Sequence, residues 1–171
     1  MTDSSIKGDY SVQSTSRSIY SLATALSLGA MVFFSLIVAE TIFASLTLQS
    51  AGTVLAHLFP SFYRFTGISS LIASVCTGFI PWPSHRYISR RIFISSAWLS
   101  TLFLAFSDMV LLPAMNAARL RIPNFAGPMT PVLKQFFFYH GISMGLIVFT
   151  MILTLLGLLL FTIRGIETRF L

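Results

Sequence analysis

The chain has 171 residues, of which 55% are hydrophobic and only 9% are charged. A single soluble core of this length cannot cover so much apolar surface, so the composition excludes an ordinary soluble domain and predicts a multi-pass membrane protein. The formal net charge of +6 comes from basic residues scattered at the ends of apolar runs, which reflects membrane topology and argues against a nucleic-acid partner. The single cysteine, Cys76, excludes a disulfide framework.

The N-terminal segment, residues 1–17, reads MTDSSIKGDYSVQSTSR and is polar and rich in serine. It is expected to form a flexible polar tail. The apolar run that follows is longer than the core of a signal peptide, so we interpret it as an uncleaved first membrane helix. At the other end, residues 164–171 are expected to form a short basic terminus.

Four apolar runs carry the hydrophobic excess, and each is long enough to cross a hydrocarbon core of ~30 Å at ~1.5 Å per residue. They span residues 18–48, 62–80, 92–115 and 132–163. Because the runs are continuous rather than alternating, they predict helices and not barrel strands. The expected fold is therefore all-α, a polytopic membrane four-helix bundle over residues 18–163.

The connection between the first two runs has a helical pattern of its own. Leu48, Leu55, Phe59 and Phe62 recur at helical spacing, and Pro60 interrupts them. This pattern predicts a short interfacial helix between the first and second membrane helices, lying at the outer surface and ending at Pro60.

The basic residues also predict the orientation in the membrane. With four spans, the side that holds both termini carries seven of the eleven Lys and Arg residues: Lys7, Arg17, Arg86, Arg90, Arg91, Arg164 and Arg169. This bias favours both termini on the cytoplasmic or matrix side. A bacterial inner membrane and a mitochondrial inner membrane fit this pattern equally.

Small residues at spacings of three and four predict where helices approach one another, because close backbone contact drives association in lipid. One stripe lies on the second run and another on the fourth: Gly67, Ser70, Ser74 and Gly78, then Gly141 and Gly145. They predict a compact arrangement of helices, with room for a contact to another subunit.

Ionisable residues inside apolar runs are the strongest functional signal, since each costs at least ~2.5 kcal/mol in hydrocarbon unless it is paired or hydrated. Counting residues from the helix ends places Glu40, Arg64, Asp108 and His140 at one depth in the outer third of the membrane. They predict a polar cluster. Its expected rim is formed by Asn116, Lys134 and Gln135. Three readings stay open: an ion-pair network that fixes helix register, a site for an ion, proton or small polar solute, and snorkelling at the interface.

Three segments then point to a family. LFPSFYRF, LLPAMNAARLR and LKQFFFYHGISM resemble signature segments of the transmembrane protein 205-like family, also catalogued as domain of unknown function 4149. The first matches at residues 58–63 and the last at residues 136–143, whereas the middle segment matches loosely. The resemblance covers about residues 20–162. It implies a four-helix integral membrane domain, and it implies no defined reaction or cofactor.

Cofactor and catalytic chemistry find little support in the residues. His57 and His85 lie at opposite interfaces, so a haem held by two histidines at one depth is not expected. His140 and Met144, one turn apart, are weak candidates for a copper(I) site, because methionine more often fills a core. No catalytic motif is present.

The sequence therefore predicts a non-catalytic integral membrane protein without a cofactor. Its expected surroundings are the lipid bilayer and other membrane protein subunits, with the chain as a structural or accessory subunit of a larger membrane assembly. The alternative is ion, proton or small-polar-solute handling through the outer polar cluster, and a copper- or haem-linked membrane protein is a weaker third reading.

Overall fold

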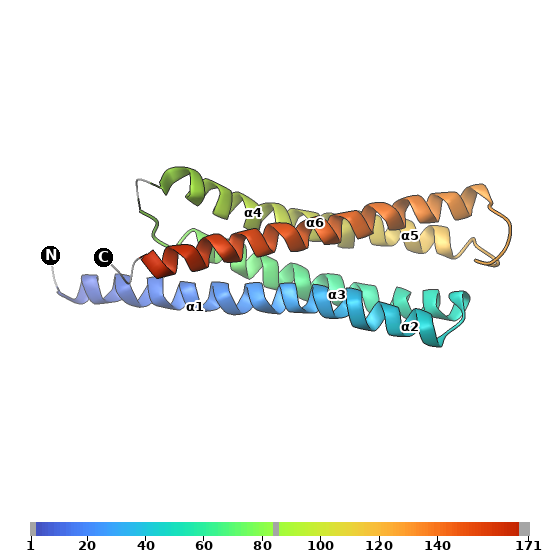
Figure 1. Cartoon of the computed structure of the whole chain (residues 1–171), viewed down its shortest axis with the longest axis horizontal. Helices are drawn as coiled ribbons and strands as arrows, with labels where there is room; N and C mark the ends of the chain where they lie inside the picture. Colours follow the sequence, from blue (N-terminus) through green and yellow to red (C-terminus); the bar gives the residue numbers. More distant parts are fainter. Residues whose placement is uncertain (1–2, 84–85, 168–171) are drawn as a thin grey trace.

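The computed structural model describes residues 3–83 and 86–167, and within these ranges every regular element is helical. The elements form four long helical segments (Figure 1). In chain order they are α1 (Asp3–Phe33) continued by η1 (Phe34–Val38) and α2 (Ala39–Ser45), then α3 (Leu48–Thr77), then α4 (Tyr87–Phe106) continued by η3 (Ser107–Leu111) and α5 (Leu112–Arg119), and finally α6 (Pro131–Glu167). The two η elements are single turns of π-helix.

Three of these segments are long and apolar enough to cross a membrane: Ser11–Ser45, Tyr87–Arg119 and Pro131–Arg164. By length and composition, these helices support the expectation of a multi-pass membrane protein. α3 has 30 residues, which is sufficient length, but its composition is more polar. Its serines, threonines and Arg64 lower its hydropathy, and many of these hydroxyl side chains lie on its buried face.

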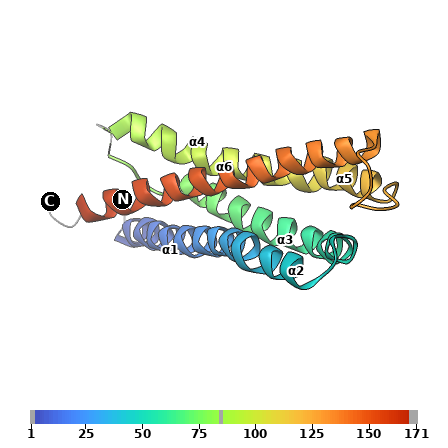
Figure 2. The ribbon, with the colours of Figure 1, turned by 45° about the vertical axis from the view of Figure 1, so that its right-hand side comes forward.

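The four segments run antiparallel, side by side along one axis, in both views (Figures 1 and 2). The start of α1, the end of α6 and the α3–α4 connection lie at one end, which we call the proximal end. The α2–α3 and α5–α6 connections lie at the other, distal end. α1 packs mainly on α3, α3 on α4, and α4 on α6, and α1 also contacts α6.

Hydroxyl groups join the helices in the middle of the molecule. Ser27 on α1 donates to the backbone carbonyl of Thr66 on α3 at 3.2 Å. The hydroxyls of Ser70 and Ser74 on α3 lie 2.9 and 2.8 Å from Thr101 Oγ1 on α4. Because lipid offers no hydrophobic drive between helices, such hydrogen bonds and close packing hold the segments together.

Two apolar clusters flank these hydroxyl contacts. The proximal cluster is centred on Tyr20 and Phe93, which lie 5.1 Å apart between ring centroids. The distal cluster includes Met31, Tyr63 and Leu104. Aromatic and other large apolar side chains therefore pack toward the two ends, and small hydroxyl residues pack between the helices in the middle.

Two expectations about helix boundaries differ from the structure. Residues 1–17 were expected to be a flexible tail, but α1 begins at Asp3 and Ser16 is buried. The interfacial helix expected to end at Pro60 is not confirmed, because α3 runs unbroken from Leu48 through Pro60. Proline removes one backbone hydrogen bond, and packing of Leu55, Phe62 and the residues beyond on the same helix outweighs that loss.

The start of α3 has a local cause. Leu46 is extended, and the Thr47 side chain accepts a hydrogen bond from the Ser50 backbone N–H at 3.3 Å. A threonine N-cap satisfies one of the free donors of the first turn. The chain therefore reverses within two residues, and α3 starts beside the end of α2.

Candidate functional site

The predicted polar cluster is not assembled as an ion-pair network. Glu40 on α2 and Arg64 on α3 are both exposed, and Asp108 and His140 are half-buried. Among the residues that the structure describes, no ion pair joins any two of these four side chains. Arg64 directly follows the buried Tyr63 but is itself exposed, so it faces away from the helix contacts that Tyr63 makes.

The three rim residues also separate. Lys134 and Gln135 are exposed, and Gln135 Nε2 donates to the Tyr139 hydroxyl at 3.1 Å on the same helix. Asn116 is half-buried on α5. Of the seven predicted residues, only Asn116 and His140 line the same cavity.

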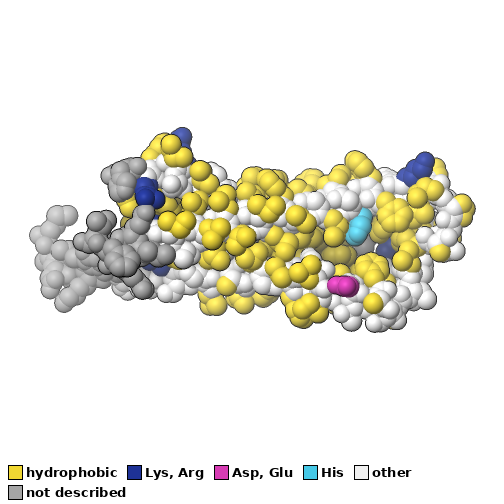
Figure 3. Space-filling view, in the orientation of Figure 1, with side chains coloured by type: hydrophobic (Ala, Val, Ile, Leu, Met, Phe, Trp, Pro, Cys, Tyr) yellow, Lys and Arg dark blue, Asp and Glu magenta, His cyan; other side chains and the backbone are white. Residues whose placement is uncertain are grey.

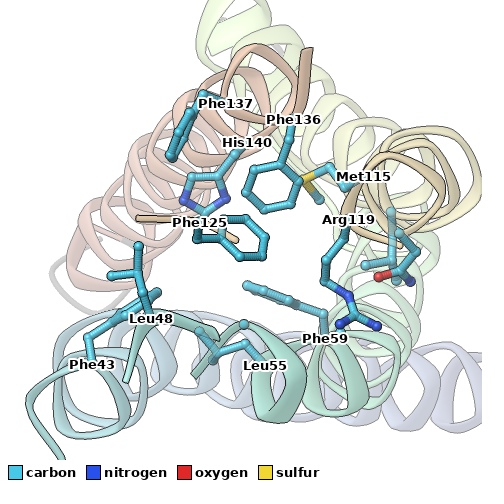
Figure 4. A pocket seen from close by; sticks show the side chains of 14 residues that line it. Phe43, Leu48, Leu55, Phe59, Met115, Arg119, Phe125, Phe136, Phe137 and His140 are labelled. Atoms are coloured by element: carbon cyan, nitrogen blue, oxygen red, sulfur yellow. The ribbon is translucent and has the colours of Figure 1, made fainter. Parts of the chain in front are cut away.

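That cavity is a pocket of about 150 Å³ at the distal end, between α2, α3, α5 and α6 (Figure 4). Its walls are almost entirely apolar and rich in aromatic rings. The lining residues are Phe43, Leu48, Gly52, Leu55, Ala56, Phe59, Leu112, Met115, Asn116, Arg119, Phe125, Phe136, Phe137 and His140. The space-filling view shows a hollow at this end, with a histidine side chain at its rim and a basic side chain within it (Figure 3).

Arg119 is the charged residue of the pocket. Its Nε atom is buried without a hydrogen-bond partner, and its Nη1 reaches Thr53 Oγ1 only at 3.5 Å. No carboxylate is among the pocket-lining residues. His140 adds a second polar group, and its ring stacks on Phe136 with a centroid distance of 5.9 Å and an angle of 5°. The pocket thus combines an apolar volume with an unneutralised cation.

The predicted small-residue stripes have different surroundings. Ser70 and Ser74 lie at the α3–α4 contact, whereas a Cβ atom added at Gly67, Gly141 or Gly145 would meet nothing within 4 Å. Gly141 and Gly145 are exposed on α6. The glycine pair of the fourth run therefore faces away from the other helices of this chain.

Gly78 is the C-cap residue of α3, and a Cβ atom there would lie 3.5 Å from the Val75 carbonyl. It marks the end of the helix. It does not form part of a helix contact surface in the way that Ser70 and Ser74 do.

The weak copper candidates do not share the pocket. Met144 is 45% exposed on α6, whereas the half-buried His140 lines the cavity. Within residues 3–83 and 86–167, no group of three or more His, Cys, Asp or Glu side chains is placed to hold a metal ion.

Sequence reasoning missed three features that the structure shows. Gly157 packs so closely that a Cβ atom would lie 3.1 Å from both Ser96 Oγ and the Tyr20 hydroxyl. Tyr63 and Ser143 join α3 to α6 through a buried hydrogen bond of 2.6 Å. The third feature is the pocket, which α5 and the α5–α6 connection help to form. In the sequence, the only indication of this pocket was the occurrence of Phe, Asn and Arg residues near position 119.

Comparison with known proteins gives a family. The family model described as "Domain of unknown function (DUF4149)" matches residues 22–123, which confirms that part of the expected resemblance; the name transmembrane protein 205 is not tested by it. An "Uncharacterized protein" of Aquifex aeolicus (strain VF5) is 30% identical over 128 residues, covering 75% of this chain and 83% of the relative. No solved structure matches.

Proposed function

We propose that this chain, which belongs to the DUF4149 family, is a non-catalytic integral membrane protein that serves as a structural or accessory subunit of a larger membrane assembly. The observation that carries the proposal is the open glycine face of α6. Gly141 and Gly145 are exposed and meet no neighbour within 4 Å of an added Cβ atom.

Glycine weakens a helix relative to alanine, and in membranes it is typical of positions where a second helix approaches closely. Within the part of the chain that the structure describes, no other helix contacts these two glycines. Large apolar side chains border it, since Phe138, Val148 and Ile152 are 65%, 52% and 56% exposed. A helix of another subunit can therefore approach the backbone at the two glycines and pack against the flanking side chains.

The proposal includes α3 as a fourth membrane-spanning helix of a bundle. Its 30 residues would extend ~45 Å at 1.5 Å per residue, and it lies antiparallel to α1 and α4 (Figure 2). Its polar composition is compatible with a bilayer because its buried face carries Thr66, Ser70 and Ser74, whose hydroxyls all form hydrogen bonds.

The test is purification of the tagged full-length chain from its native membrane in a gentle detergent, with mass spectrometry of the proteins that accompany it. We expect other membrane subunits in stoichiometric amount. The variant with Gly141→Leu and Gly145→Leu should lose them. Ala105→Leu is the matched control, because Ala105 is exposed on α4, and it should retain them.

Three outcomes would contradict the accessory role. They are a wild-type chain that purifies alone, a chain that is accompanied only by a second copy of itself, and partners that survive the double glycine variant as well as they survive the control. The alternative of ion or polar-solute handling is less favoured, because the pocket walls are largely apolar and Glu40 and Arg64 lie outside them.

A further inference from the structure

We infer that the distal pocket is a binding site for an anionic phospholipid, with the phosphate at Arg119 and part of one acyl chain between the aromatic side chains. This inference concerns a ligand of the chain and does not depend on the assembly proposed above. It rests on the charge of the pocket, the nature of its walls, the place of its opening and its volume.

The charge of the pocket comes from Arg119, which has no acidic partner among the lining residues. Arg119 is half-buried, and a guanidinium that is partly removed from water without a counter-ion carries a desolvation cost. A phosphate removes that cost, because the planar guanidinium forms paired, charge-assisted hydrogen bonds with phosphate oxygens. The buried Nε without a partner is a donor available for such a bond, and Asn116 supplies a second polar group on the same helix.

The depth of Arg119 suits a lipid headgroup. It is the last residue of the apolar segment Tyr87–Arg119, and the end of a membrane-spanning segment is expected where headgroups meet hydrocarbon. The pocket then runs inward along α5 to Leu112, about 10 Å closer to the membrane centre at 1.5 Å per residue. A lipid with its phosphate at Arg119 therefore has its acyl chain at the depth of the apolar walls.

The opening of the pocket faces the side of the molecule between α2 and α6. α2 packs against α3 but makes no comparable contact with α6 within the described residues. Phe43 and Leu48 border this side and Phe137 faces them (Figure 4), and these three side chains are 46%, 50% and 43% exposed. An opening rimmed by exposed apolar side chains admits a lipid chain from the bilayer more readily than a polar solute from water.

The volume indicates how much of the lipid enters. A dry apolar cavity of about 150 Å³ holds a molecule the size of benzene, or roughly six carbon atoms. The pocket, at about 150 Å³, therefore takes the upper part of one acyl chain. The rest of that chain and the second chain would lie along the outside of α2 and α6, in contact with neighbouring lipids.

The experiment is native mass spectrometry of the delipidated full-length protein in dodecyl maltoside, titrated with dioleoyl phosphatidylglycerol or dioleoyl phosphatidylcholine. We expect one molecule of the anionic lipid to bind at least tenfold more tightly than the zwitterionic lipid. Arg119→Gln should remove this preference. Arg121→Gln is the matched control, because it removes the same charge from an exposed position two residues away, and it should keep the preference.

A second variant tests the acyl-chain part of the site. Ala56→Phe places a ring in the pocket and should weaken the binding of both lipids. Ala105→Phe on the exposed face of α4 should leave the binding of both lipids unchanged. Circular dichroism and gel filtration check that each variant is folded. Equal loss of the preference in Arg119→Gln and Arg121→Gln would show general surface attraction and overturn the site. Retention of a neutral quinone or a free fatty acid instead of phospholipid by the protein as first purified would overturn the choice of ligand.

Discussion

The hydrogen bond between Tyr63 and Ser143 should contribute a measurable part of the stability of this protein. The two hydroxyls lie 2.6 Å apart, and the residues are 1% and 3% exposed. They connect α3 to α6, two helices that both pack mainly on α1 and α4 rather than on each other. Removing one partner leaves the other hydroxyl buried with one bond fewer.

The magnitude follows from two opposing effects. A buried hydroxyl that loses its partner costs ~1–3 kcal/mol in soluble proteins, whereas interhelical hydrogen bonds in membranes average ~0.6 and reach ~1.7 kcal/mol. A serine in a helix can also bond back to the carbonyl four residues earlier, which reduces the loss. We therefore expect Tyr63→Phe to lower the free energy of unfolding by ~1 kcal/mol, and Ser143→Ala by a similar amount.

The assay is reversible unfolding in detergent micelles, applied to Tyr63→Phe, Ser143→Ala and the double variant. The coupling energy of this cycle should be ~0.6–1.7 kcal/mol. Tyr139→Phe is the matched control, because its hydroxyl accepts a bond at an exposed site and its loss should change stability little. A coupling energy near zero, with Tyr63→Phe as mild as Tyr139→Phe, would refute the reasoning.

Two further predictions concern packing and charge. Gly157→Ala should lower the free energy of unfolding by ~1–3 kcal/mol through overpacking, since the new Cβ would lie 3.1 Å from two buried hydroxyls. Gly141→Ala, at an open position, should not lower it. Equal melting temperatures for the two variants would contradict this prediction. The effects of Glu40→Ala and Arg64→Ala on stability should add independently, because both side chains are exposed and no ion pair joins them within the described residues. A coupling above ~1 kcal/mol in that double-mutant cycle would instead restore the paired arrangement expected from the sequence.

The helices were the predictable part of the fold, because a long apolar run leaves the backbone no other way to satisfy its hydrogen bonds in lipid. Boundaries were less predictable. Residues before Arg17 are polar enough to be a tail, yet α1 begins at Asp3. Pro60 has the chemistry of a helix breaker, yet α3 continues through it. In α3, buried side chains on both sides of Pro60 pack against other helices, and this packing, which the local sequence does not contain, overrides the local preference.

The polar cluster was predicted only from the depth of each residue along its helix, which does not give the direction of its side chain. Counting residues gives the height of a side chain along a helix, but its direction changes by 100° per residue. Tyr63 is buried and Arg64, the next residue, is exposed. His140 and Asn116 share the pocket because their directions coincide as well as their heights. The direction of each helix face is set by tertiary packing, so this part of the site could not be obtained from spacing.

The position of the pocket follows from the sizes of the side chains between the helices. In the middle of the molecule, small residues such as Ser70 and Ser74 let α3 and α4 approach closely enough for direct hydroxyl contacts. At the distal end the rings of Phe59, Phe125 and Phe136 line the pocket between the helices. The volume between these rings is open beside Arg119 (Figure 4). Small hydroxyl residues thus bring the helices together in the centre of this protein, whereas large aromatic residues border an apolar pocket with one arginine at its distal end.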